Sequence, residues 1–338
     1  MSTNRKTGLV VLYNHHFERN IPLIRELYRH NFSEMRQIMP FYRPDQQGTE
    51  GQTENQDVLS VFGNSFLFHS YIAQVRSHLM EMKCDDILII GDDLLLNPSI
   101  TEDNLHDKLQ IPPGHFYIDG VVNICDGEYY RPVQEAHRFS PHPPGLDGSA
   151  NRWVPPYDEA FNILHKKGLM THTILNSYHP FFPLWQEPLL SLSNLHANYK
   201  IFKARVYHTL AALKYRLFPK RFSYPCVFGY SDILLIPKEK LDLFCRYMEV
   251  FATWGMFVEL AIPTALMLMP DCHVSHASGH DLKTGNVWYP QNPKHFKNIN
   301  DLIQKTIAAS EGRLDKLGDA FPQDYLYLHP VKLSQLNF

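Results

Sequence analysis

The stretch Cys84–Pro98, CDDILIIGDDLLLNP, is the starting point for predicting the fold. Its centre, Ile87–Ile90, is a continuous apolar run, which predicts a strand covered on both faces. Asp92 and Asp93 follow the strand directly, at the edge of an open α/β sheet where ligands bind. Two adjacent carboxylates repel each other unless a positive charge lies beside them. The pair therefore indicates either a divalent-cation site or a polar turn that ends a strand.

The residues before this stretch alternate between two periodicities. Strand-like apolar runs occur at Gly8–Tyr13, Met35–Tyr42 and Val58–Phe62, and helical spacing occurs at Phe17–His30 and Ser65–Met82. This alternation predicts an α/β fold with a mostly parallel, doubly wound sheet flanked by helices. Neither GxGxxG nor GxxxxGK[ST] occurs, which disfavours a Rossmann dinucleotide site and a P-loop.

The chain is expected to divide into three parts. Residues 1–135 form the β/α half, and residues 136–290 form a second half with a Pro- and Gly-rich insertion at Phe139–Tyr157. Residues 291–338 are expected to be a helical tail, with one helix at Ile299–Ala309 and polar residues after it.

Composition limits the class of protein. Hydrophobic residues make up 44% of the 338 positions, which is ample for a core, and the net charge of −3 gives no support to nucleic-acid binding. The five cysteines are scattered without a CxxC pair, which suits a reducing compartment and disfavours a structural zinc site. There is no apolar run of membrane-spanning length, and the first apolar run, GLVVLY, is too short for a signal peptide. A cytoplasmic protein is expected.

A basic segment follows the insertion. Ser193–Leu217 is expected to be a long helix, and residues 200–221 contain seven basic residues and no acidic one. One interpretation is an ordinary solvated face. The other is a surface that meets anionic lipid headgroups at the inner face of a membrane, or a pyrophosphate-bearing acceptor.

Three further features follow in order towards the C-terminus. Phe228–Asp232 is a glycine-containing turn within a strand-like segment. Glu259 is an isolated carboxylate in apolar surroundings, where a charge is costly unless it is paired or used. A histidine cluster comes last, with His273, His276 and His280.

This order of features resembles the GT-A fold of nucleotide-sugar-dependent glycosyltransferases, particularly those that make bacterial surface polysaccharides. The resemblance covers roughly residues 8–280. In that family an acidic motif of the DXD kind ends a strand and holds a metal on the donor diphosphate. A glycine-containing segment lies beside the donor, a later carboxylate at a helix start is the base in inverting members, and a C-terminal histidine can complete the metal site. Here Gly91 stands where the first carboxylate of that motif would be.

The resemblance implies a GT-A-like Rossmann-type sheet, a nucleotide-sugar donor held by residues 1–135, and an acceptor held by residues 136–290. It implies a Mn²⁺ or Mg²⁺ ion bound by Asp93 and His276, with Asp92 in support. The other implied site residues are Glu259 as base, Asp232 as an acceptor or donor contact, and Asn14, His15, Asn64 and Gly229 as donor contacts. Each also has an ordinary interpretation, as a turn residue, a loop histidine or a helix N-terminal charge.

The predicted function is therefore transfer of a sugar from a nucleotide-diphosphate donor to a glycan or lipid-linked acceptor, with inversion favoured. The chemistry is coherent, because a cation on Asp93 would stabilise the leaving diphosphate and Glu259 would accept the acceptor proton. One alternative is a metal-dependent hydrolase that uses Asp92, Asp93, His273 and His276, although neither HxH nor HExxH occurs. Another is a non-catalytic sugar- or nucleotide-binding protein of the same fold.

Overall fold

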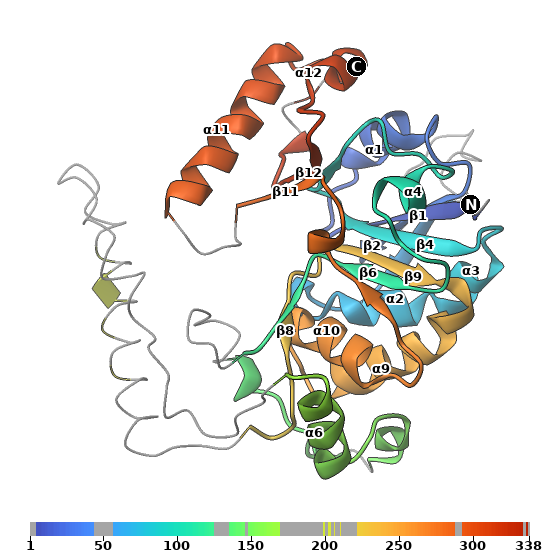
Figure 1. Cartoon of the computed structure of the whole chain (residues 1–338), viewed down its shortest axis with the longest axis vertical. Coiled ribbons are helices and arrows are strands. Elements are labelled where there is room, and N and C mark those ends of the chain that lie inside the picture. Colours follow the sequence, from blue (N-terminus) through green and yellow to red (C-terminus); the bar gives the residue numbers. More distant parts are fainter. Residues whose placement is uncertain are drawn as a thin grey trace.

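A computed structural model describes residues 5–43, 57–124, 135–145, 148–169, 222–287, 293–333 and 336, together with the helical positions 199, 202, 203, 206 and 210. Its centre is a seven-stranded sheet with the order β10-β6-β9-β4-β1-β2-β3 (Figure 1). The strands span β1 Thr7–Leu12, β2 Met35–Pro40, β3 Val58–Val61, β4 Asp86–Gly91, β6 Phe116–Ile118, β9 Ile233–Pro237 and β10 Val274–Ser275.

The sheet is parallel except for one strand. β1 pairs in parallel with both β2 and β4, β2 pairs in parallel with β3, and β10 pairs in parallel with β6. β9 runs antiparallel to β4 and to β6. The predicted α/β class with a mostly parallel sheet is therefore confirmed, and the first four predicted strands lie within two residues of the observed ones.

Helices cover both faces of this sheet. Alternate side chains of a strand point to opposite faces, so this cover buries every residue of β1 and β4. One core contains α2 (His69–Gln74), α3 (Arg76–Glu81), α9 (Leu241–Thr253) and α10 (Val258–Leu268). The other contains α1 (Asn20–Tyr28), α4 (Leu105–Lys108) and the C-terminal segment (Figure 1). The prediction of one continuous helix at Ser65–Met82 is wrong. The segment begins with a 3-10 helix, η2 (Ser65–Leu67), and Val75 separates α2 from α3.

The chain between β6 and β9 adds smaller elements. β7 (Val121–Val122) pairs with β8 (Phe228–Gly229), while η3 (Ser149–Trp153) and α6 (Tyr157–Lys166) pack beside α9 and α10. The predicted strand Thr171–Leu175 lies outside the described residues, as does most of the predicted basic helix. Strands from both sides of residue 135 lie in one sheet, and the boundaries at 135 and 290 stay predictions.

The C-terminal segment corrects one expectation. The helix predicted there is α11 (Pro293–Ala309), but the polar tail expected after it is wrong. The short helices η6 (Leu314–Lys316) and α12 (Leu317–Ala320) lead to β12 (Tyr325–His329), which joins β11 (Lys283–Asn286) and β5 (Leu95–Leu96) in a second sheet. Leu326, Tyr327 and Leu328 are fully buried, so this strand belongs to the core.

The reversed strand β9 determines which residues share an edge of the sheet. Because β9 is antiparallel, its first residues lie where β4 ends, and the backbone N–H of Gly91 donates to Asp232 O at 3.1 Å. The short helix η4 (Lys238–Lys240) and α9 return from the far edge, so α10 begins again at the carboxyl edge of the parallel strands. A further 3-10 helix, η5 (Ala277–Gly279), follows β10.

Within the described part of the chain, no helix is both long enough and apolar enough to cross a bilayer.

Gly229 is required by a close backbone approach. A Cβ added there would lie 2.5 Å from Gly120 O and 3.1 Å from Pro263 Cβ, whereas one added at Gly120 meets nothing within 4 Å. We expect Gly229→Ala to lower the free energy of unfolding by about 1–3 kcal/mol through overpacking. Gly120→Ala should change it by less than about 0.5 kcal/mol. Denaturant unfolding measures both, and equal midpoints for the two variants would contradict this packing.

Candidate active site

Four carboxylates meet at the carboxyl edge of the central sheet. Asp92 and Asp93 follow β4, Asp119 follows β6, and Asp232 precedes the antiparallel β9. All four are half-buried rather than fully exposed. The sequence predicted three of them as site residues; Asp119 was missed, because nothing in its local sequence relates the end of β6 to the other strands.

Asp92 lies at the point where the order of the parallel strands changes direction. The chain moves from β1 to β2 and β3 on one side, and β4 lies on the other side of β1. Ligands of open α/β sheets bind outside such a switch point. The Asn14 backbone N–H donates to Asp92 Oδ1 at 3.3 Å, and Asn20 Nδ2 donates to Oδ2 at 3.4 Å. Burial, with the nearby charge of Asp93, raises the pKa of Asp92 to about 7.

A narrow gap, too small to hold a water molecule, lies at the same point. Its lining comes from the ends of β1 and β4 and the start of β9: Leu12, Asn14, Phe68, Ile89, Ile90, Gly91, Ser231 and Asp232. Two predicted site residues, Asn14 and Asp232, therefore line one hollow although they are far apart in the sequence.

Asp93 is paired with a histidine from the last strand of the chain. His329 Nε2 lies 3.1 Å from Asp93 Oδ1, and its Nδ1 lies 2.6 Å from the hydroxyl oxygen of Tyr230. Burial alone would raise the pKa of Asp93, but the hydrogen bond and charge of His329 lower it. Burial alone would lower the pKa of His329, but the bond to Asp93 and the charge of Asp232 raise it. The contact between the two side chains therefore favours the charged form of each.

The hydroxyl groups of two tyrosines hold Asp119. Tyr117 donates to Oδ1 at 3.1 Å, and Tyr327 of β12 donates to Oδ2. The Tyr117 hydroxyl also lies 3.0 Å from His280 Nε2. Burial raises the pKa of Asp119 to about 7 despite these bonds. Asp119 therefore changes its charge near neutral pH, within a network that joins β6, β12 and the histidine cluster.

Gly91 explains how Asp93 and Asp232 come together. A Cβ added at Gly91 would lie 3.2 Å from Asp93 Oδ1 and 3.9 Å from Asp232 Oδ1. Both carboxylates thus approach the space that a side chain at position 91 would occupy. Burial and the charge of His329 act in opposite directions on Asp232, and its pKa is raised.

Three other predicted residues, His276, Asn64 and His15, lie outside the Asp93–His329 pair. The His276 Nδ1 atom lies 3.3 Å from Ile118 O, and burial lowers the pKa of its ring. The exposed Asn64 side chain caps η2 by accepting from Phe66 N at 3.0 Å. His15 is exposed, and its charge helps to lower the pKa of Asp93. Among the described residues, the histidine in contact with Asp93 is His329 and not the predicted His276.

Glu259 lies half-buried in the first turn of α10, on the same edge of the sheet as the four carboxylates. Gly229 is buried in β8, where its role is packing against Gly120.

The donor atoms at the edge suit a hard cation. Mg²⁺ and similar ions bind through one or two carboxylates and complete their shell with water and phosphate oxygens. Asp93 and Asp232 supply two such carboxylates around one point. Over the described residues, no group of three or more His, Cys, Asp or Glu side chains is arranged to hold a metal by itself. Oxygens of a bound phosphate group would have to complete the site.

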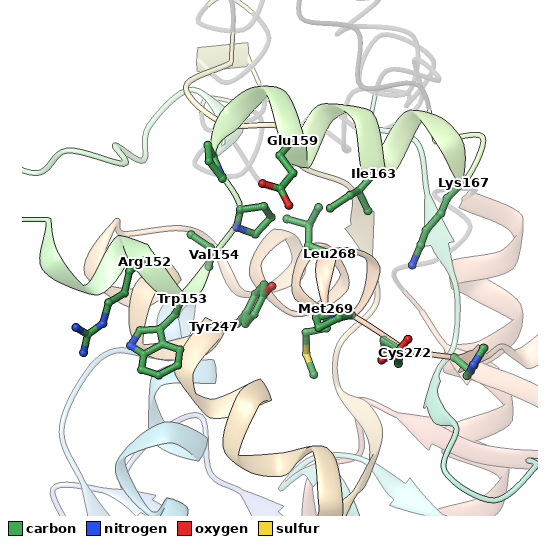
Figure 2. A pocket seen from close by; sticks show the side chains of 15 residues that line it. Arg152, Trp153, Val154, Glu159, Ile163, Lys167, Tyr247, Leu268, Met269 and Cys272 are labelled. Atoms are coloured by element: carbon green, nitrogen blue, oxygen red, sulfur yellow. The ribbon is translucent and has the colours of Figure 1, made fainter.

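A larger pocket lies at the opposite edge of the sheet. It encloses about 670 Å³, and its walls include Glu159 of α6, Lys167 directly after α6, Tyr247 of α9 and Leu268 at the end of α10 (Figure 2). His273 also lines it and accepts a backbone bond from Phe116, the first residue of β6. Since Asp119 follows the last residue of β6, this pocket is separated from the four carboxylates by the length of that strand.

Neither a protein-family model, nor a curated protein, nor a solved structure matches this chain.

The raised pKa of Asp119 predicts that the stability of the folded protein depends on pH. A carboxyl group with a raised pKa binds its proton more tightly in the folded state than in the unfolded chain. The folded protein therefore loses stability as pH rises from about 4, the unfolded value, to about 7. Asp119→Asn does not titrate and keeps two hydrogen-bonding positions for the tyrosines. Between pH 4 and pH 8, the free energy of unfolding of the variant should rise relative to that of the wild type by an amount on the order of 2 kcal/mol.

Denaturant unfolding at several pH values measures this difference. Asp103→Asn, which removes an exposed carboxylate before α4, is the control and should show no such gain. A difference between Asp119→Asn and wild type that stays constant with pH would mean that Asp119 titrates normally.

Proposed function

We propose that the chain is a glycosyltransferase of GT-A-like fold that moves a sugar from a nucleotide-diphosphate donor to a glycan or lipid-linked acceptor, in the synthesis of a cell-surface polysaccharide. One observation carries this proposal: Asp93 and Asp232 meet around Gly91, beside the Asn14 loop, at the switch point of a mostly parallel sheet. That is where α/β proteins bind nucleotides.

The charge of the edge supports a metal-dependent donor site. A diphosphate would be repelled by an ionised Asp93 and its neighbouring carboxylates. A divalent cation, Mn²⁺ or Mg²⁺, held between Asp93, Asp232 and the diphosphate would convert this repulsion into attraction. When bound, it would stabilise the negative charge that develops on the leaving diphosphate.

His329 keeps Asp93 ionised and fixes its orientation, and Asp92 supports the loop through its bonds to Asn14 and Asn20. Asn14 and His15 contact the base or ribose of the nucleotide, because they lie in the loop after β1 at the switch point. Asn64 and Gly229 stay candidate donor contacts, and His276 stays a candidate metal ligand.

Glu259 is the proposed base of an inverting transfer. An acceptor hydroxyl needs a base within hydrogen-bond reach on the face opposite the leaving group. Glu259 lies on the carboxyl edge, in the first turn of an otherwise buried, apolar helix, and its own side chain is half-buried. Asp232 is proposed to contact the donor sugar or the acceptor.

The hydrolase alternative is less well supported. A two-metal site built from Asp92, Asp93, His273 and His276 needs all four side chains together. His273 instead lies directly before β10, and its carbonyl oxygen accepts a bond from the first residue of β6. It is therefore at the opposite edge of the sheet from Asp92 and Asp93. A non-catalytic protein of this fold would also bind the nucleotide, so only a turnover assay distinguishes it from the transferase.

Ligand-dependent melting tests the donor site. A nucleoside diphosphate should raise the melting temperature of the wild type in the presence of Mn²⁺, because a ligand at 100 times its Kd adds about 2.7 kcal/mol. Asp93→Asn should lose this shift. Glu259→Gln should keep the shift but lower nucleoside diphosphate release from a nucleotide sugar by about 100-fold or more.

Asp103→Asn is the matched control and should behave as wild type. A wild type that shows no shift with any nucleoside diphosphate and Mn²⁺ would overturn the proposal. Nucleotide binding without turnover of any nucleotide sugar would favour the non-catalytic alternative. Full turnover by Glu259→Gln would make Glu259 the wrong base and favour a retaining mechanism.

A second surface supports a peripheral position at the inner face of a membrane. The described helical positions Tyr199, Phe202, Val206 and Leu210 are spaced by three and four residues, so they share one helix face, and all are exposed. The sequence around them is basic and lacks acidic residues from 200 to 221. An apolar face with flanking Lys and Arg is typical of helices that lie on anionic lipid.

Flotation with vesicles at low salt tests this contact. Wild type should float with anionic vesicles and not with neutral ones, since each basic residue near an anionic surface adds about 1 kcal/mol. Replacing both Phe202 and Leu210 by Glu should abolish flotation, whereas Phe296→Glu, at an exposed position of α11, should not. Equal flotation of the double variant would exclude this face.

A further inference from the structure

Two exposed phenylalanines stand at the carboxyl ends of neighbouring strands. Phe41 directly follows β2 and is 51% exposed, and Phe62 directly follows β3 and is 68% exposed. Their ring centroids lie 5.8 Å apart with an angle of 75° between the ring planes. Both rings are therefore on the same edge of the sheet as the acidic pair, and neither is used by the core.

The backbone holds both rings in place. Phe41 has φ +58°, in the left-handed region that residues with a Cβ rarely adopt, and its N–H donates to Val61 O at 2.8 Å. The side-chain amide of Gln74 bonds both backbone groups of Phe62, at 2.9 Å to the N–H and 2.8 Å to the carbonyl oxygen. Strained backbone persists where surrounding contacts impose it, and it clusters at ligand-binding positions.

The two rings form a corner rather than a flat patch. With planes 75° apart, one ring offers a face on which a planar ligand can stack, and the other contacts the edge of that ligand. Offset-stacked and edge-to-face contacts are the two arrangements that aromatic rings prefer. The corner therefore fits a flat, aromatic ring better than an aliphatic chain.

The distance to the acidic pair suits a nucleotide. Adjacent strands are about 4.8 Å apart, so β2 and β3 lie about 10 and 14 Å from β4 across the sheet. In a nucleoside diphosphate, the ribose and the first phosphate separate the base from the terminal phosphate. A diphosphate held at Asp93 can therefore place its base at the ends of β2 and β3 while the ribose crosses the end of β1.

We propose that Phe41 and Phe62 bind the nucleobase of the donor by stacking. This inference rests on the proposed function and adds to it the residues that hold the base. Stacking on an aromatic side chain tolerates any base, since every base has a π-face. The corner would thus supply affinity, and polar groups elsewhere would select the base.

Equilibrium binding in the presence of Mn²⁺ tests the stacking corner, with two ligands compared: a nucleoside diphosphate and inorganic pyrophosphate, which lacks the base. Phe41→Ala and Phe62→Ala should each weaken binding of the nucleoside diphosphate by about 5- to 100-fold. Their affinity for pyrophosphate should equal that of wild type. Phe296→Ala, an exposed phenylalanine of α11, is the matched control and should leave both affinities unchanged.

A second variant reports on the contact directly. Phe62→Trp keeps an aromatic face, so it should retain the nucleoside diphosphate affinity of wild type. The fluorescence that this variant adds over wild type should be quenched by the nucleoside diphosphate and not by pyrophosphate. If the added fluorescence stays unquenched at saturating nucleoside diphosphate, the base does not stack at this position.

The remaining outcomes separate this inference from the proposed function. Alanine variants that bind the nucleoside diphosphate as wild type does would overturn the stacking corner and leave the donor site intact. Alanine variants that lose pyrophosphate equally would show that the rings act through the fold, which also overturns it. A wild type that binds neither ligand would overturn both proposals. If the alanine variants change only the oligomeric state or vesicle flotation, the corner contacts protein or lipid instead.

Discussion

The repulsion between carboxylates gathered at one strand edge is the constraint on which the rest of this structure depends. Asp93 and Asp232 approach one point around Gly91, with Asp92 beside them. Half-buried like charges are costly. His329 lowers this cost at Asp93 by pairing with its carboxyl group, and at Asp92 burial and the charge of Asp93 raise the pKa. Such arrangements destabilise a fold, and titratable groups with perturbed pKa values are concentrated at functional sites.

The last strand of the chain, β12, contacts this edge. β12 brings Tyr327 to Asp119 and His329 to Asp93, and the backbone N–H of Val331 donates to Asp93 O at 2.7 Å. A segment close to the C-terminus thus fixes side chains that follow β4 and β6. The second sheet brings β12 to this edge, since β12 pairs with β5 shortly after the acidic pair.

Local sequence patterns predicted the frame of the fold well. The apolar runs gave β1 to β4, and with them the position of Asp92 and Asp93 at a strand end. His329 and Asp119 could not be found in this way, because their roles arise from pairing between strands that are distant in sequence. The alternation of Tyr325–His329 was a strand signal that the polar surroundings obscured. Gly91 lacks the carboxylate that the sequence motif would have there, and in the structure the carboxylate of Asp232, which precedes β9, lies near this position.

The central claim is that this edge binds a divalent cation together with a nucleoside diphosphate. A crystal structure of the protein with a nucleoside diphosphate and Mn²⁺, with the metal located by its anomalous scattering, tests it most directly. The account predicts a Mn²⁺ ion about 2.1 Å from a carboxylate oxygen of Asp93 and in contact with the diphosphate. A metal or a nucleotide bound elsewhere, with the Asp93 carboxylate still facing only His329, would contradict it.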